Sequence, residues 1–158
     1  MTATTGPLVI DSIADLEAAV GVELGPGPWL RVDQDRIDTF ARATDDHQWI
    51  HVDQERAAAG PYGATIAHGY LTLSLVSGLA ADLYTFTLGS ARLNYGLDRV
   101  RFPTPVPVGS RLRLRCTIAA LEEREASVLV PIDFVVELED ADRPACVVRK
   151  MSLVLLGG

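Results

Sequence analysis

The sequence contains few of the residues that bind metals or form disulfides. Among 158 residues there are three histidines and two cysteines. Cys116 and Cys146 stand 30 positions apart within strand-like segments, which is neither metal-binding nor redox spacing. We therefore expect two buried thiols that behave as small apolar side chains, and no metal site.

Long apolar runs are also missing. None approaches the ~20 residues that a helix needs to span a bilayer. The longest apolar segment is interrupted by Gly78 and Asp82, and the N-terminus lacks the basic start of a signal peptide. These features predict a soluble, cytoplasmic protein without a membrane partner.

Positive charge is scarce in the first part of the chain. The net charge is −7, and residues 1–60 contain 11 acidic and 4 basic side chains, against 10 and 10 in residues 61–158. An acidic chain is a poor nucleic-acid binder, so we expect no such partner. A local basic cluster in the second part could still hold a small anion.

The first 60 residues show helical periodicity broken by turns. Apolar residues at helical spacing predict a helix within 10–21 and another over 33–44, which Asp33 can cap. A short strand is expected at 29–32. Residues 45–51 are expected to form a loop, and residues 52–60 a short helix that ends at Gly60.

The remainder divides into one apolar segment and four strand-like runs. Residues 68–86 are apolar almost all round, which predicts one buried helix. The runs that follow alternate or are rich in β-branched residues, with turn residues between them: 91–102, 110–121, 126–138 and 145–156. We predict an α+β domain over residues 1–158, an antiparallel meander wrapped around a central helix, with residues 1–27 as an N-terminal helical extension.

Two separated motifs resemble a known family. The segments FARATDDHQWIH (40–51) and AAAGPYGATIAHGYLTLSL (57–75) resemble the (R)-specific enoyl-CoA hydratase signature of the MaoC-like dehydratases, and NYGLDRVRFPTPVPVGSRLR (94–113) is similar to the segment after the central helix. The nodulation-protein-N-like subgroup is the most similar. The resemblance implies a hot-dog fold, a homodimer, and reversible hydration of trans-2-enoyl thioesters to (R)-3-hydroxyacyl thioesters, with acyl-CoA or acyl-carrier substrates.

The resemblance also implies a catalytic pair. The family places a histidine five residues after its catalytic aspartate, which selects Asp46 and His51 here. Gln48 and Trp49 stand where the family often has Asn-Pro, so we expect them to shape the substrate pocket. His68-Gly69 matches the entry of the family's central helix, and Ser77 matches a serine inside that helix.

The reaction explains why such residues are needed. Water must lose a proton as it attacks the β-carbon, the α-carbon must gain one, and the thioester oxygen must be stabilised as an enolate. A carboxylate and an imidazole that share one water can move both protons. The backbone N–H of Gly69, at a helix start, can face the oxyanion. No metal or organic cofactor is required.

Each of these residues also has a structural interpretation. An aspartate near a helix end is commonly a cap, a glycine before a helix a turn, and a serine within a helix a donor to a carbonyl one turn earlier. For His68 we favour a structural role over contact with the substrate. We expect Trp49 to pack beside the acyl site.

Arginines at alternate positions suggest a phosphate site. Arg111, Arg113 and Arg115 leave one face of a predicted strand, and Arg99 and Arg101 repeat the pattern one strand earlier. Arg101 is a candidate for binding the phosphates of the thioester carrier. The alternative is a solvated sheet face that the acids of residues 122–125 balance.

Three other functions are compatible with the same scaffold. A hot-dog thioesterase would need a carboxylate on or near the central helix, but none precedes Asp82 in that segment. A non-catalytic acyl-thioester-binding module would not need Asp46 and His51. The chain could also form one half of a heterodimeric dehydratase.

Overall fold

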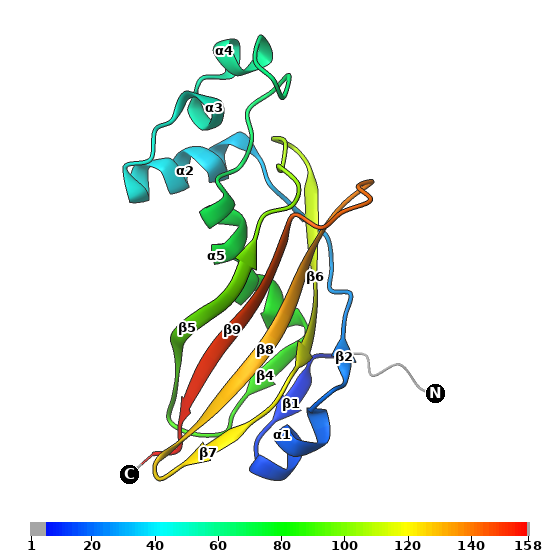
Figure 1. The fold of residues 1–158 in the computed structure, drawn as a ribbon, viewed down its shortest axis with the longest axis vertical. Helices are drawn as coiled ribbons and strands as arrows, with labels where there is room; N and C mark the ends of the chain where they lie inside the picture. Colours follow the sequence, from blue (N-terminus) through cyan, green and yellow to red (C-terminus); the bar gives the residue numbers. More distant parts are fainter. Residues whose placement is uncertain (1–5, 158) are drawn as a thin grey trace.

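The structure, a computed structural model, describes residues 6–157 and is dominated by one twisted sheet. Four long antiparallel strands form its body in the order β6-β8-β9-β5: β5 (Ala91–Arg101), β6 (Arg111–Ile118), β8 (Ser127–Leu138) and β9 (Cys146–Leu155). Short strands extend its edges: β2 (Glu23–Leu24) and β3 (Leu30–Arg31) on β6, and β7 (Glu122–Arg124) on β8. Figure 1 shows helix α5 lying against this sheet.

Three of the helices in residues 6–157 begin at side-chain caps. Their bounds are α1 (Ile13–Ala19), α2 (Gln34–Thr44), α3 (Trp49–Val52), α4 (Gln54–Ala58), α5 (Gly69–Leu79) and the 3-10 turn η1 (Ala80–Asp82). Ser12 forms a capping box with Asp15, and the Asp33 and Asp53 carboxylates accept from backbone N–H groups of α2 and α4. The Asp33 cap confirms the sequence-based prediction.

The core lies between α5 and the inner face of the sheet. Strand β9 alternates between buried and half-buried positions along its whole length, as a strand with one covered face should. Cys116 and Cys146 point into this core as free thiols, as predicted. Burial raises the pKa of Cys116 to about 12 and that of Cys146 to about 11, so both are unreactive at neutral pH.

The central helix is shorter and more exposed than its composition predicted. α5 ends at Leu79, and the chain then turns through η1 into β4 (Tyr84–Phe86), which pairs in parallel with β1 (Leu8–Ile10). One face of α5 is uncovered, and Tyr70 is 69% exposed. The prediction of a single, fully buried helix over 68–86 was therefore wrong.

Other local predictions also need correction. The long strands do not form a simple meander, because β5 pairs with β9, the last strand, rather than with β6. Residues 122–125 contribute β7 instead of only a turn, and α3 begins inside the expected loop 45–51. The described part of the N-terminal extension contains α1, as predicted, and also β1 and β2. The α+β class is confirmed.

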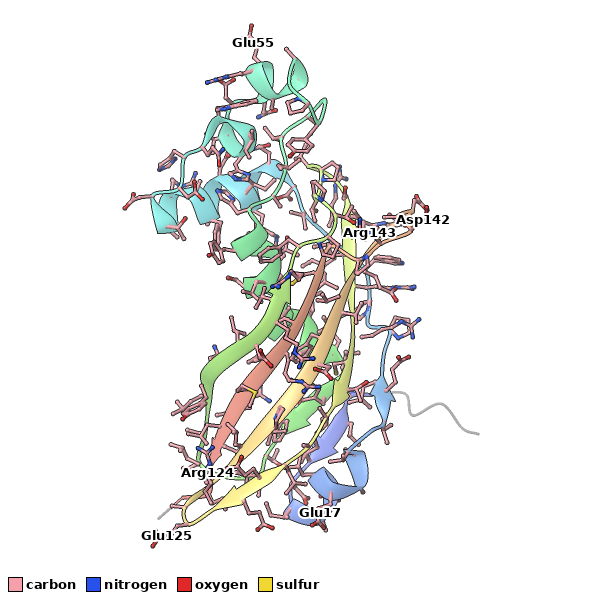
Figure 2. All side chains as sticks on the ribbon, in the orientation of Figure 1. Glu17, Glu55, Arg124, Glu125, Asp142 and Arg143 are labelled. Carbon is pink, nitrogen blue, oxygen red and sulfur yellow. The ribbon has the colours of Figure 1, made fainter. Side chains whose placement is uncertain are left out.

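Three helices gather at one end of an elongated molecule, while α1 lies towards the other end (Figure 1). α2, α3 and α4 lie beyond the N-terminus of α5 (Figure 1). Glu55 of α4 marks this end, while Arg124 and Glu125 mark the opposite tip, at the β7–β8 turn (Figure 2). Among residues 6–157, no helix is long and apolar enough to cross a bilayer.

Candidate active site

The segment between α2 and α3 reverses the chain sharply. Asp45 ends α2 in the left-handed conformation, with φ of 57°, which aspartate adopts more readily than most side chains. The reversal is followed by Asp46 and then by α3, which contains His51. Asp45 therefore serves the turn, while Asp46 and His51 face the same region.

His51 is buried and held in one orientation. It is 6% exposed, and its Nδ1 lies 2.7 Å from the carbonyl oxygen of Ile66. A carbonyl only accepts, so Nδ1 carries the proton and Nε2 is left with a lone pair. Burial is the largest cause that lowers the pKa of His51, with a further lowering by His68, against the raising effects of the Ile66 carbonyl and Asp46. The neutral, accepting form of the ring is therefore favoured.

His68 links the two parts of the site. Its ring stacks on that of His51 with centroids 3.8 Å apart and planes at 25°, and it also contacts Phe40. Its Nε2 donates to the Asp46 carbonyl oxygen at 2.9 Å. The ring is only 2% exposed, and its Nδ1 has no hydrogen-bond partner within the described chain. His68 thus holds the backbone of Asp46 in place.

A glutamine from α2 braces the same region. The Gln34 amide donates to the His51 carbonyl oxygen at 2.8 Å and to the Asp38 carboxylate at 2.7 Å. Its own oxygen accepts from the Thr65 hydroxyl. These bonds tie α2, α3 and the segment before α5 together, so His51 is fixed by its ring and by its backbone.

The three polar side chains converge on a small volume. Candidate ligand atoms of Asp46, His51 and His68 lie within 4.8 Å of one another. This composition could in principle hold a metal ion. However, the imidazoles stack almost in parallel, so their in-plane lone pairs do not converge on one point as metal ligands must. The separation instead suits one water, which can bridge two groups at about 2.8 Å from each.

Gly69 follows this cluster at the first position of α5. Its N–H belongs to the first helical turn, where no intrahelical carbonyl is available. A Cβ at this position would lie 3.1 Å from the Phe102 ring. The close approach of Phe102 is therefore one reason for glycine at this position. The close approach of a substrate, which the sequence analysis expected, is a second reason.

The other predicted residues lie at different distances from the cluster. Gln48 precedes α3 as its exposed N-cap residue. Trp49 packs against Gly60 and beneath the Arg56 guanidinium, 4.3 Å from its ring centroid. Ser77 lies two turns further along α5, where its hydroxyl accepts from the Lys150 amine.

The arginines differ from one another in their partners. Those of β6 lie on the outer face and pair with Glu139, Glu137 and Glu23, rather than with the acids of residues 122–125. They therefore form an ion-pair ladder. Arg101 is outside this ladder, with its guanidinium on the carbonyl of Val100, and it precedes Phe102, the residue that covers Gly69.

Four participants escaped the sequence analysis. Gln34 and Thr65 follow no local pattern, because their bond joins residues 31 positions apart. Phe102 was visible only as part of a strand. Lys150 could have been found, since it occupies an inward position in the alternation of β9.

Comparisons with known proteins identify the family of the chain. The family model described as "MaoC like domain" matches residues 15–136. The chain is 46% identical over 142 residues to 3-hydroxyacyl-thioester dehydratase Z of Mycobacterium tuberculosis (strain ATCC 25618 / H37Rv), covering 89% of this chain and 94% of the relative. It is 47% identical over 149 residues to Nodulation protein N of Rhizobium leguminosarum bv. viciae, covering 90% and 91% respectively.

Solved structures have the same fold. A monoamine oxidase regulatory protein from Archaeoglobus fulgius superposes with a TM-score of 0.71 at 25% identity, covering 86% of this chain and 90% of that one. An (R)-hydratase from A. caviae superposes with a TM-score of 0.65 at 24% identity, covering 84% and 96%. The sheet wrapped around α5 is therefore the hot-dog arrangement that the sequence resemblance implied.

Proposed function

Because the chain belongs to the MaoC-like dehydratase family, whose members are hydratase or dehydratase lyases, we propose that it hydrates trans-2-enoyl thioesters reversibly to (R)-3-hydroxyacyl thioesters. The observation that carries this proposal is the meeting of Asp46 and the His51 ring within 4.8 Å, directly before Gly69 at the start of α5. The pair provides proton transfer, and the helix start provides an oxyanion donor.

In the hydration direction, one water is held between the Asp46 carboxylate and Nε2 of His51. Its oxygen bonds to the β-carbon while one O–H bond breaks, and the carbon–carbon π electrons move to give an enolate. The N–H of Gly69 donates to the enolate oxygen. The α-carbon then takes up a proton from the pair, which returns to its starting protonation state, and dehydration follows the same steps in reverse. The proposal uses only groups of the chain and no cofactor.

The carrier of the thioester is coenzyme A or an acyl-carrier pantetheine, and Arg101 is proposed to contact its phosphates. Arg101 has no carboxylate within ion-pair distance in residues 6–157, whereas the β6 arginines are occupied by acids. A guanidinium next to the Phe102–Gly69 contact is suitably placed for the carrier end of the substrate. A cytoplasmic location is part of the same proposal.

The exposed edge of the sheet supports assembly as a homodimer. β5 pairs only with β9, so its other edge is unpaired among residues 6–157, and Leu93, Tyr95 and Leu97 of this strand are exposed. A long apolar edge strand is normally covered, and two-fold pairing of β5 strands would also cover Tyr70 of α5. We expect Tyr95→Lys to give monomers in size-exclusion chromatography with light scattering. Val135→Lys, an exposed apolar position on the outer face, should leave the dimer intact.

The activity is tested with a panel of trans-2-enoyl-coenzyme A substrates of increasing length. Loss of the enoyl absorbance without release of free thiol is the expected result. Release of thiol would instead indicate the thioesterase alternative, which α5 disfavours because it contains no carboxylate. Binding without either change would indicate a non-catalytic module.

A further inference from the structure

A cavity of about 630 Å³ lies between α5 and the β5–β9 side of the sheet. Leu73 and Val76 of α5, Leu97 of β5 and Val148 of β9 give it apolar walls. Such a cavity suits a hydrocarbon chain. One charged side chain, Lys150, also lines it.

Lys150 is the only lysine in the sequence. It is 7% exposed, and its amine donates to the Ser77 hydroxyl at 3.3 Å. No carboxylate of residues 6–157 lies within ion-pair distance of it. Burial, together with the nearby Arg92, lowers its pKa. A buried amine without a counter-ion is costly, and at this inward β9 position an apolar residue would be more stable.

A second polar group lies on the same inner face. Ser152 is 0% exposed, and its hydroxyl has no hydrogen-bond partner in the described chain. It stands two residues after Lys150, directly across from Asn94, which lines the cavity. Lys150 and Asn94 therefore add polar groups at the β5–β9 side of the cavity, and Ser152 lies buried beside them without lining it. Unsatisfied buried groups of this kind mark a place for a polar ligand atom.

The helix and strands that line the cavity provide no counter-ion for Lys150. α5 contains no acidic residue. The one acidic residue of β5, Asp98, stands across from Arg149, which is paired with Asp133 on the outer face. The counter-charge must therefore come from elsewhere.

The cavity and the candidate active site lie along the same helix, α5. Gly69 and Ser77 are eight positions apart on α5, about 12 Å along the helix axis. Tyr70, Leu73, Ser74 and Ser77 form a continuous stripe at helical spacing between these points. An acyl chain whose thioester lies at Gly69 can follow this stripe to Lys150.

We propose that the cavity binds the distal end of the acyl chain and that Lys150 binds a carboxylate at that end, which makes ω-carboxylated enoyl thioesters the substrates of this protein. The proposal rests on the proposed function. The carboxylate neutralises the buried amine and accepts from Lys150 and from the Ser77 hydroxyl. The chain methylenes fill the apolar part of the cavity.

The test compares two trans-2-enoyl-coenzyme A series of matched length, one ending in methyl and one in carboxylate, with lengths that bracket the ~12 Å span. The native protein should have the higher kcat/KM on the carboxylated series. Lys150→Met should lower that value by about 10- to 100-fold, the loss expected for one hydrogen bond to a charged group, and should raise the value for the methyl series. Arg149→Met, the outward-facing neighbour, should leave the ratio unchanged.

Equal ratios in the native protein and in Lys150→Met would overturn the proposal, as would a native preference for the methyl series. If neither series is hydrated, the proposed function fails. Calorimetric binding of the matched saturated thioesters then decides about Lys150 separately. Tighter binding of the carboxylated thioester that is lost in Lys150→Met supports the site, and equal binding of both thioesters refutes it.

Discussion

The outer face of the sheet and the region around the start of α5 both contain dense polar groups, but they use them differently. On the outer face, arginine and carboxylate side chains pair with each other across β6 and β8. Near the start of α5, each of the two buried histidines uses one ring nitrogen to donate to a backbone carbonyl. The other ring nitrogen has no hydrogen-bond partner within residues 6–157. A polar group whose bonding is complete stabilises the fold, whereas one with unused capacity can act on a ligand.

The largest effect on turnover should come from replacing the carboxylate or the imidazole of the candidate catalytic pair. Asp46→Asn and His51→Gln should each lower hydratase turnover by ~10²–10⁴, because proton transfer by a positioned group contributes about that much. Both variants should still unfold cooperatively. Asp45→Asn and His47→Gln are the matched controls, and a loss of activity in Asp45→Asn would shift the assignment by one residue.

A smaller loss is expected at the oxyanion donor. Gly69→Ala adds a methyl group 3.1 Å from the Phe102 ring and into the proposed substrate approach, and the loss of one oxyanion donor in another enzyme costs ~10²–10³ in turnover. The double variant with Phe102→Leu separates the two causes. Recovery of turnover in the double variant would show that contact with Phe102 was the reason for glycine. Ser77→Ala should cost less than Gly69→Ala.

The buried amine of Lys150 should destabilise the fold, whereas the paired arginines of the outer face should stabilise it slightly. The pKa of Lys150 is lowered in the fold, so the unfolded chain binds more protons between that lowered value and the ordinary 10.5. Below the lowered value the buried charge opposes folding in full. Lys150→Met should therefore raise the unfolding temperature at neutral pH, by roughly 2–4 °C per kcal/mol gained. Differential scanning calorimetry measures this shift. A lower unfolding temperature would mean that the amine stabilises the fold.

His51 should make stability depend on pH. Its pKa lies below the ordinary 6.5, so the unfolded chain binds more protons and stability decreases as pH falls through 6.5 towards the lowered value. We compare the free energy of unfolding in urea of the native protein and of His51→Gln between about pH 5 and 8, the range in which histidine changes charge. The variant should show a flatter profile, and identical profiles would contradict the burial of a neutral ring.

The smallest effect is expected on the outer face. Arg113→Gln removes one member of a partly exposed ladder and should lower the free energy of unfolding by about 0–1 kcal/mol without changing turnover. Chemical denaturation and the hydratase assay check both statements. A large loss of activity would restore the phosphate-cradle interpretation of the β6 arginines.

Local chemistry made much of the fold predictable from the sequence. The alternation of β6, β8 and β9 and the Asp33 cap depend on neighbours in the chain. The order of the strands does not, which is why β5 was placed beside β6 instead of β9. The end of α5 at Leu79 was missed because Tyr84–Phe86 is equally apolar as a strand that pairs with β1.

In the candidate site, too, local features could be predicted and contacts between distant segments could not. Asp46 and His51 could be assigned because they lie close together in the chain and their spacing resembles the family's motif. The contact of His68 with the Asp46 carbonyl and the bond from Gln34 to His51 join distant segments, so no local pattern indicated them. The exposure of α5 on one face follows from the packing of the whole chain, which composition alone does not determine.

The central claim is tested most directly by the product formed from trans-2-enoyl-coenzyme A and water. The native protein should consume the enoyl absorbance and yield the (R)-3-hydroxyacyl thioester, identified by chiral chromatography, and Asp46→Asn should form almost none. An (S) product, release of free thiol, or an Asp46→Asn variant as active as the native protein would contradict the account.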